Sequence, residues 1–280
     1  MSLQQSPQTP LFMRKQIVLV ITVKLLLQFS TIQAQHLTHD VGFHIDYLAI
    51  QTDYGARNDF SSSYGNRGIS LSFSHTVHFF NNDLRWNFDH PIWSHLAIRN
   101  ELSIITKVNL KHYGRYLDGN NSVVVNQLRS MTGSTRMLSM GFQLEYYFRC
   151  LRDFMYPYPD WKLNPYFLAG LRYNAFKTDL NSSLGDWRQD PSVLPEKWRP
   201  SEALAIGKGN TFSAVFGSGF RYKLNPKFDL NAQLSWHFFF SDAVDGLQAD
   251  VVENQDNEWS VNFQIGIIYH LNYLRPLKLF

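Results

Sequence analysis

Two side chains in the C-terminal third of the chain have the types needed for nucleophilic chemistry. Ser235 and His237 are two residues apart, so on a strand they lie on the same face. A serine beside a histidine can act as a nucleophile with its general base, as in a lipid hydrolase or acyltransferase. Such an enzyme must present the pair to lipid. This pair lies on the polar face of its segment, which favours a structural, hydrogen-bonded pair.

Charged residues occupy the same kind of alternate position in other segments. A set of nearly balanced charge in a narrow interior should form ion pairs rather than line a pore. Arg99 and Arg172 are available to neutralise Glu101 and Glu145, whereas the functional alternatives are a gated ion path or a carboxylate pair in acid and base catalysis. The predicted structural polar core comprises Asp46, Arg99, Glu101, Lys107, Glu145, Arg172, Arg221, Lys223, Asp229 and His237.

The histidines and the cysteine give weak signals for metal or redox chemistry. His36, His39 and His44 form a loose cluster near the start of the first segment, and His75 and His78 should face opposite sides of a strand. The single cysteine excludes an intrachain disulfide and a thiolate metal cluster. Residues 206–210 place glycines around a lysine but lack the spacing of a phosphate loop. No cofactor is expected.

The first 34 residues have the pattern of a secretory signal peptide. Arg14 and Lys15 precede an apolar run from Ile17 through Leu27, and a small residue, Ala34, stands before the expected cleavage site. The polar residues before Met13 suggest Met13 as the true start of translation. The apolar run is shorter than the ~20 residues of a membrane anchor. Arg14, Lys15 and Lys24 account for the whole net charge of +3. The remaining chain, 35–280, is formally neutral, so no nucleic-acid partner is expected.

The positions of these side chains are set by a long alternating pattern from Thr211 to Phe240. Apolar and polar residues alternate on both sides of the turn Asn225-Pro226-Lys227. A period of two on both sides of a proline turn indicates an antiparallel hairpin with one apolar face. Each arm is longer than the five or six residues usual in soluble strands and matches the roughly 9 to 11 that cross a bilayer.

Six further segments share this alternation, which predicts an all-β fold: an eight-stranded antiparallel up-and-down transmembrane β-barrel. Part of residues 177–210 could add a hairpin and make ten strands. The eight segments are Val41 to about Ile50, Ile69–Phe79, Leu96–Leu110, Arg136–Phe148, Tyr166–Phe176, Phe212–Leu224, Phe228–Phe240 and Trp259–Leu271.

Periodicity alone does not say which face points inward. A soluble lipocalin-like barrel would turn its apolar face inside and its polar face to water. Water-facing strands are rich in Lys and Glu, but the polar faces here carry mostly Ser, Gly, Asn and Gln. Small uncharged polar residues suit a narrow, filled interior, so the membrane barrel is favoured.

The connections suggest an orientation in an outer membrane. Those after the first, third, fifth and seventh segments are long and polar, and the others are shorter, in strict alternation. Long extracellular loops and short periplasmic turns are typical of outer-membrane barrels, which places both termini in the periplasm. The long loops are expected to serve either in recognition or as caps over the rim. Candidate recognition residues are Tyr113, Tyr116, Trp187 and Trp198. Aromatic residues on the turn side, expected to form an interfacial girdle, are Trp86, Trp93, Tyr156, Tyr158, Trp161, Tyr166, Tyr269 and Tyr273.

Three stretches, residues 51–60, 127–135 and 143–146, carry a resemblance to a family. They read QTDYGARNDF, QLRSMTGST and QLEY, and the chain resembles an uncharacterised family of Bacteroidota outer-membrane β-barrel proteins over nearly its whole mature length. The resemblance implies a fold and a location without an established activity. By analogy alone, the resemblance suggests a role beside the type IX secretion or gliding machinery. Expected partners are outer-membrane lipids, the barrel assembly machinery and a protein at the extracellular loops.

Overall fold

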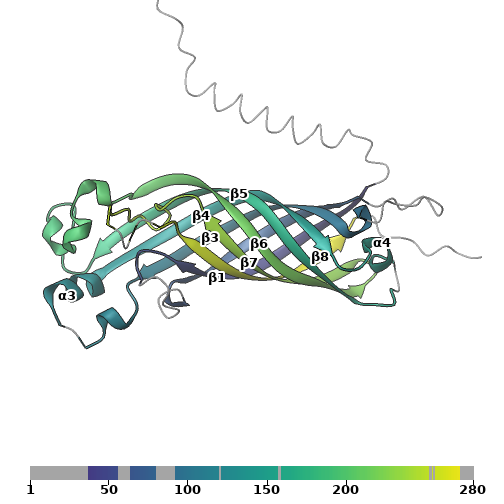
Figure 1. Cartoon of the computed structure of the whole chain (residues 1–280), viewed down its shortest axis with the longest axis horizontal. Coiled ribbons are helices and arrows are strands. Elements are labelled where there is room, and N and C mark those ends of the chain that lie inside the picture. Colours follow the sequence, from purple (N-terminus) through teal and green to yellow (C-terminus); the bar gives the residue numbers. More distant parts are fainter. Residues whose placement is uncertain are drawn as a thin grey trace, which may run out of the picture.

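The computed structural model describes residues 37–55, 64–79, 92–119, 121–156, 159–251, 254 and 256–271. Eight strands in these residues form one closed sheet (Figure 1). Their bounds are β1 Thr38–Gln51, β2 Arg67–His78, β3 Leu96–Lys111, β4 Met131–Tyr147, β5 Leu163–Ser182, β6 Gly207–Asn225, β7 Phe228–Phe239 and β8 Trp259–His270.

Each strand pairs antiparallel with the next one, and β8 closes the sheet by pairing with β1. The tight connection between β6 and β7 forms as the sequence predicts. The Asn225 side chain accepts hydrogen bonds from the backbone N–H groups of Lys227 (2.9 Å) and Phe228 (3.1 Å). These hydrogen bonds stabilise the turn, and the register of β6 with β7 shifts beside it, between Lys223 and Asn225. The eight-stranded up-and-down barrel is therefore confirmed, and the ten-strand alternative is wrong because residues 183–206 form 3-10 turns instead of a hairpin.

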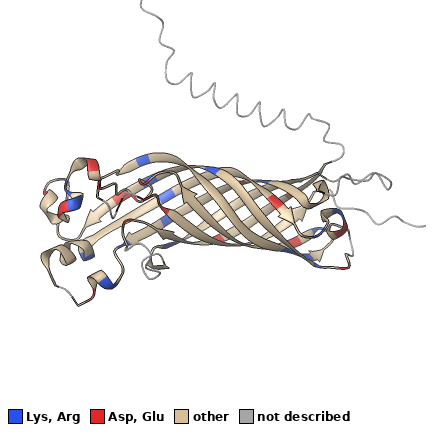
Figure 2. Ribbon diagram, viewed as in Figure 1, with Lys and Arg blue, Asp and Glu red and all other residues tan. Residues whose placement is uncertain are grey.

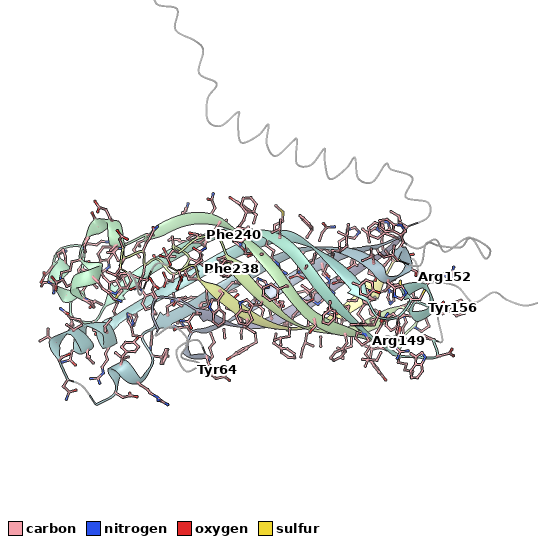
Figure 3. All side chains as sticks on the ribbon, in the orientation of Figure 1. Tyr64, Arg149, Arg152, Tyr156, Phe238 and Phe240 are labelled. Atoms are coloured by element: carbon pink, nitrogen blue, oxygen red, sulfur yellow. The ribbon has the colours of Figure 1, made fainter. Side chains whose placement is uncertain are left out.

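The two faces of the sheet differ in the way the alternation predicts. Along β2, Leu71 and Phe73 are exposed while Ser70, Ser72 and Ser74 are buried. The same division recurs around the barrel, whose outer face carries projecting apolar and aromatic side chains (Figure 3). A closed sheet with small polar residues inside and large apolar residues outside is the reverse of a soluble barrel.

A β-bulge in β3 corrects one predicted face. The register between β3 and β4 shifts between Ile105 and Val108, so the inward and outward positions exchange beyond it. Val108 is buried and Lys107 is exposed on the outer face. The prediction that Lys107 lies in the lumen is wrong for this reason.

The connections divide between two ends, called here the loop end and the turn end (Figure 1). The connections after β1, β3, β5 and β7 lie at the loop end. Strict alternation of length is wrong, because the connection after β2, residues 79–95, is about as long as that after β1, residues 52–66. β4, β5 and β6 are the longest strands, with 17, 20 and 19 residues.

The interior is closed by apolar side chains at both ends. At the loop end, residues 183–206 and 240–251 form a loop cap, in which Leu204 bridges to Leu247 and the Ala205 N–H donates to the Gly246 carbonyl. At the turn end, the short helix α4 (Leu151–Phe154) packs its buried residues against Tyr147 and Tyr166. α3 (Val123–Ser130) lies outside the barrel at the loop end (Figure 1).

The predicted signal peptide and the choice between Met1 and Met13 lie outside the described residues. So do Trp86, Tyr158 and Tyr273 of the predicted girdle. Both described ends of the chain lie at the turn end, where Asp40 of β1 pairs with His270 of β8. Among the described helices, none has the length and apolar character needed to cross a membrane.

Candidate functional site

Charged side chains from five strands meet in the interior near the turn end. Asp40 accepts a hydrogen bond from Arg221 at 2.5 Å, and its carboxylate lies 2.6 Å from His78 and 2.7 Å from His270. Asp229 lies 3.3 Å from Arg221 and 3.0 Å from His270, and 3.3 Å from the Nζ of Lys223. All six side chains of this Asp40 cluster are buried.

A second group, the Arg99 cluster, lies closer to the middle of the barrel. The Nε of Arg99 is 2.8 Å from Glu145, and Arg172 donates to Glu101 at 2.6 Å. The Tyr147 hydroxyl donates to Glu145 at 2.6 Å. Both glutamates thus have the basic partners expected for them, so a proton-sharing carboxylate pair is not what the geometry provides.

The charges of the two clusters and Asp46 nearly balance. In this part of the described lumen, four Arg and Lys residues face five carboxylates, and all nine are at most 4% exposed. The ring nitrogens of His270 lie 2.7 Å from Asp40 and 3.0 Å from Asp229, and its Nε2 also lies 3.1 Å from the Nζ of Lys223. Asp46 receives a hydrogen bond from Ser72 and forms no ion pair within the described residues.

Buried ion pairs cross the described lumen, and an apolar cluster lies at each end of it. A cavity of about 10 Å³ lies between the Arg99 cluster and the loop cap, lined by residues that include Glu101, Arg172 and His237. Such a volume holds about one water molecule. Polar side chains therefore fill this lumen, as expected for a barrel of eight strands.

The Ser235 and His237 pair forms, but inside the barrel. The Ser235 Oγ lies 3.1 Å from the Nε2 of His237, and the Asn262 amide nitrogen lies 3.4 Å from the same atom. Both residues are buried on the wall of the small cavity. A serine and a histidine in this position have no access to a lipid substrate outside the barrel.

The predicted histidine cluster is divided between the two faces of the sheet. His44 points inward, with its Nε2 2.8 Å from the Ser74 hydroxyl. His39 is half-buried and stacks on His75 of β2, with ring centroids 5.3 Å apart. His36 lies outside the described residues. No group of three or more His, Cys, Asp or Glu side chains in the described residues could hold a metal ion.

The candidate recognition residues have different surroundings at the loop end. Tyr113 and Tyr116 are each 37% exposed, and Trp187 is half-buried with Arg188 stacked on its ring at 4.5 Å. Trp198 is fully buried in the apolar core of the loop cap. Trp198 therefore packs within the cap, and its side chain is not exposed for the ligand contact predicted for it.

Buried carboxylates join the loop cap to the first connection. The Asp53 N–H donates to Asp245 at 2.8 Å, and the Leu247 N–H donates to the same side chain at 2.7 Å. Burial, together with the charge of Asp53, raises the pKa of Asp245 well above its ordinary value. Burial and the charge of Asp245 likewise raise the pKa of Glu258. The cap thus favours the neutral forms of these acids.

Several interior residues escape the sequence analysis. Asp40 lies one residue before the predicted first strand, although its spacing from Asp46 already puts it on the polar face. Tyr166 is predicted for the interfacial girdle, but it is buried and its hydroxyl donates to Asn231 at 2.9 Å. Tyr147 is two residues from Glu145, and this spacing alone places it on the same polar, inward face of the strand. At the turn end Trp93, Tyr156 and Trp161 are exposed, as a girdle requires.

Comparison with known proteins finds similar solved structures only. No known family matches the sequence, and no curated protein is significantly similar to it. Ail of Yersinia pestis, solved with the heparin analogue sucrose octasulfate, is 12% identical and covers 84% of this chain and 99% of its own, with a TM-score of 0.40. Neisserial surface protein A is 14% identical, covering 82% and 96%, with a TM-score of 0.41.

A third similar structure is OprG, an outer membrane protein of Pseudomonas aeruginosa. It is 15% identical and covers 85% of this chain and 96% of its own, with a TM-score of 0.40. Likeness at this level carries no argument about ligand or activity. The barrel fold rests on the strand pairing of the chain itself, and the resemblance to a Bacteroidota family remains an expectation.

Proposed function

We propose that the protein is an integral outer-membrane barrel that acts as a binding or scaffold component through its loop end. In this proposal the exposed apolar outer face contacts acyl chains, the loop end lies outside the cell, and both termini lie in the periplasm. Residues 1–34 serve as the signal peptide. Outer-membrane lipids and the barrel assembly machinery are then necessary partners.

The observation that carries the proposal is a closed lumen beneath a loop end that exposes apolar side chains. Val123 at the start of α3 is 73% exposed, and Val124, Leu184 and Tyr64 are at least half exposed. They are held by a well-packed scaffold, since the Ser122 hydroxyl caps α3 and the Gln127 amide donates to the Ser192 carbonyl at 2.7 Å. Exposed apolar groups on rigid loops are typical of protein recognition.

The geometry disfavours the two alternatives. A narrow channel needs a continuous aqueous path, whereas ion pairs and apolar plugs fill the described lumen. A lipid hydrolase or acyltransferase needs its nucleophile at the lipid face, whereas Ser235 is buried inside. A role beside the type IX secretion or gliding machinery agrees with a scaffold but has no specific support in the geometry.

Site-specific photocrosslinking tests the proposal. A photoreactive phenylalanine analogue replaces Val123 or Leu184 in the full chain, expressed in its native host, and Lys162 at the turn end is the matched control. We expect the loop-end positions to yield a discrete crosslinked protein that the control position does not yield. If the two ends give the same products, or the loop end crosslinks only to lipid, the binding role is wrong.

A further inference from the structure

Four basic residues lie side by side on the outer face of the barrel, toward the loop end. The register places Arg136 of β4 opposite Lys177 of β5, and Lys177 opposite Lys208 of β6. Lys107 lies in the β3 bulge, which faces Arg136. All four are exposed. Figure 2 shows basic segments on neighbouring strands in this part of the barrel. These four residues are called here the cationic row.

The positive charge of the cationic row has no counterpart within the described protein. Like charges directly opposite on neighbouring strands destabilise a sheet. None of the four side chains forms an ion pair or hydrogen bond with a described residue. Asp179, the nearest acid on the same face of β5, forms no ion pair with the row. Within the described protein the row is not neutralised, so binding of an external anion would relieve its repulsion.

The height of the cationic row on the barrel indicates where that anion resides. Toward the middle of the barrel, the next residue of the same face after Arg136 is Leu138, which is exposed and apolar. Tyr173 of β5 and Phe212 of β6 lie next to the row, with their ring centroids 5.4 Å apart. They form part of the aromatic rim of the apolar surface. The row and this rim are two to four residues apart along each strand, which is roughly 7 to 14 Å. This is the level of lipid headgroups.

We propose that the cationic row binds the phosphate groups of lipopolysaccharide, the phosphorylated glycolipid of the outer leaflet of a Gram-negative outer membrane. Four strands at a spacing of about 4.8 Å extend the row over about 15 Å, wide enough to contact more than one phosphate. Lysine and arginine side chains donate charge-assisted hydrogen bonds to phosphate oxygens. The inference rests on the proposed orientation, in which the loop end faces the cell exterior.

Native mass spectrometry of the detergent-solubilised full chain tests the inference, with deep-rough lipopolysaccharide as the probe. Its dephosphorylated form and phosphatidylglycerol are the comparison lipids. The variant R136Q/K177Q/K208Q removes three charges of the row, and the control K162Q/K227Q/R188Q removes three exposed charges elsewhere. We expect the row variant, and the wild type with dephosphorylated lipid, to bind about tenfold more weakly or worse, from the loss of charge-assisted hydrogen bonds. The control should bind like the wild type.

Thermal unfolding gives a second readout, in which the Tm of the row variant and of the wild type are compared without and with glycolipid. Without glycolipid the row variant should melt at a higher temperature than the wild type, because the repulsion is removed. With glycolipid the wild type should gain the larger increase in Tm. Equal glycolipid affinity of wild type and row variant overturns the inference, as does equally tight binding of phosphatidylglycerol.

The proposed orientation is tested separately, so that its failure is distinguishable. In a Cys150→Ser background, Ser192→Cys at the exposed loop end should react with an impermeant maleimide in intact cells. Labelling only after lysis would overturn the orientation, and with it the assignment of the glycolipid, whatever the affinity of the purified protein.

Discussion

Replacing Asp40 by asparagine tests whether interior ion pairs hold the barrel together. The Asp40 carboxylate lies within 2.7 Å of Arg221, His78 and His270, and it is fully buried. Asparagine keeps the shape of the aspartate side chain but loses its charge. Its amide N–H₂ group is a hydrogen-bond donor, and it would face the donors of Arg221 and the histidines. Breaking a buried ion pair by removing one partner costs about 3 to 5 kcal/mol. We expect Asp40→Asn to lower the free energy of unfolding by that amount.

The matched control is Asp46→Asn on the same strand and face. Asp46 is also buried but forms no ion pair within the described residues, and asparagine can still accept the hydrogen bond from Ser72. The loss should therefore be about 1 kcal/mol or less, the usual net worth of one hydrogen bond. Urea titration of the protein folded in lipid vesicles, followed by gel mobility without boiling, measures both variants. Arg221→Met added to Asp40→Asn should recover part of the loss, because the two sites interact. Equal losses for the two single variants would refute the role of the ion pairs.

Three further predictions concern the loop cap and the interior pair. Trp198→Ala should destabilise the cap by about 3 to 5 kcal/mol, the usual cost for a buried aromatic side chain, seen as faster proteolysis of residues 183–206 while the barrel stays folded. Because the pKa values of Asp245 and Glu258 are raised in the folded cap, its stability should be full below about pH 4, near the pKa values of the unfolded chain, and fall as pH rises. Hydrogen exchange in residues 240–251 measures this fall, which Glu258→Gln should reduce. Finally, Ser235→Ala combined with His237→Ala should leave any cellular phenotype of the protein unchanged, provided that gel mobility without boiling shows a folded barrel. Loss of the phenotype in a folded double variant would revive the enzyme alternative.

The sequence predicts the barrel well because each strand repeats one simple constraint. Ser70 to Ser74 alternate with Leu71 and Phe73, and only one arrangement of a closed sheet satisfies both faces. The same parity identifies Arg99, Glu101, Glu145 and Arg172 as interior neighbours. Their pairing follows because unpaired charges in a filled lumen are too costly.

The errors occur where a local feature overrides the period of two. The bulge in β3 moves Lys107 outward, and nothing in the alternation itself marks its position. Residue type alone predicts ligand contact for Trp198 and an interfacial position for Tyr166. Their burial depends on contacts with distant segments: Trp198 packs in the loop cap, and Tyr166 donates a hydrogen bond to β7. The cationic row also depends on register between strands, which the sequence alone does not supply.

The most direct test of the account is the environment of each face of the strands in a bilayer. Spin labels at Phe73 and Leu234, each 53% exposed, should be relaxed strongly by lipid-soluble oxygen and weakly by a water-soluble nickel complex. Labels at Ser72 and Ser235, which are buried, should be shielded from both reagents. Shielding at Phe73 and Leu234, with nickel access at Ser72 and Ser235, would show that the barrel is turned the other way and is not a membrane protein.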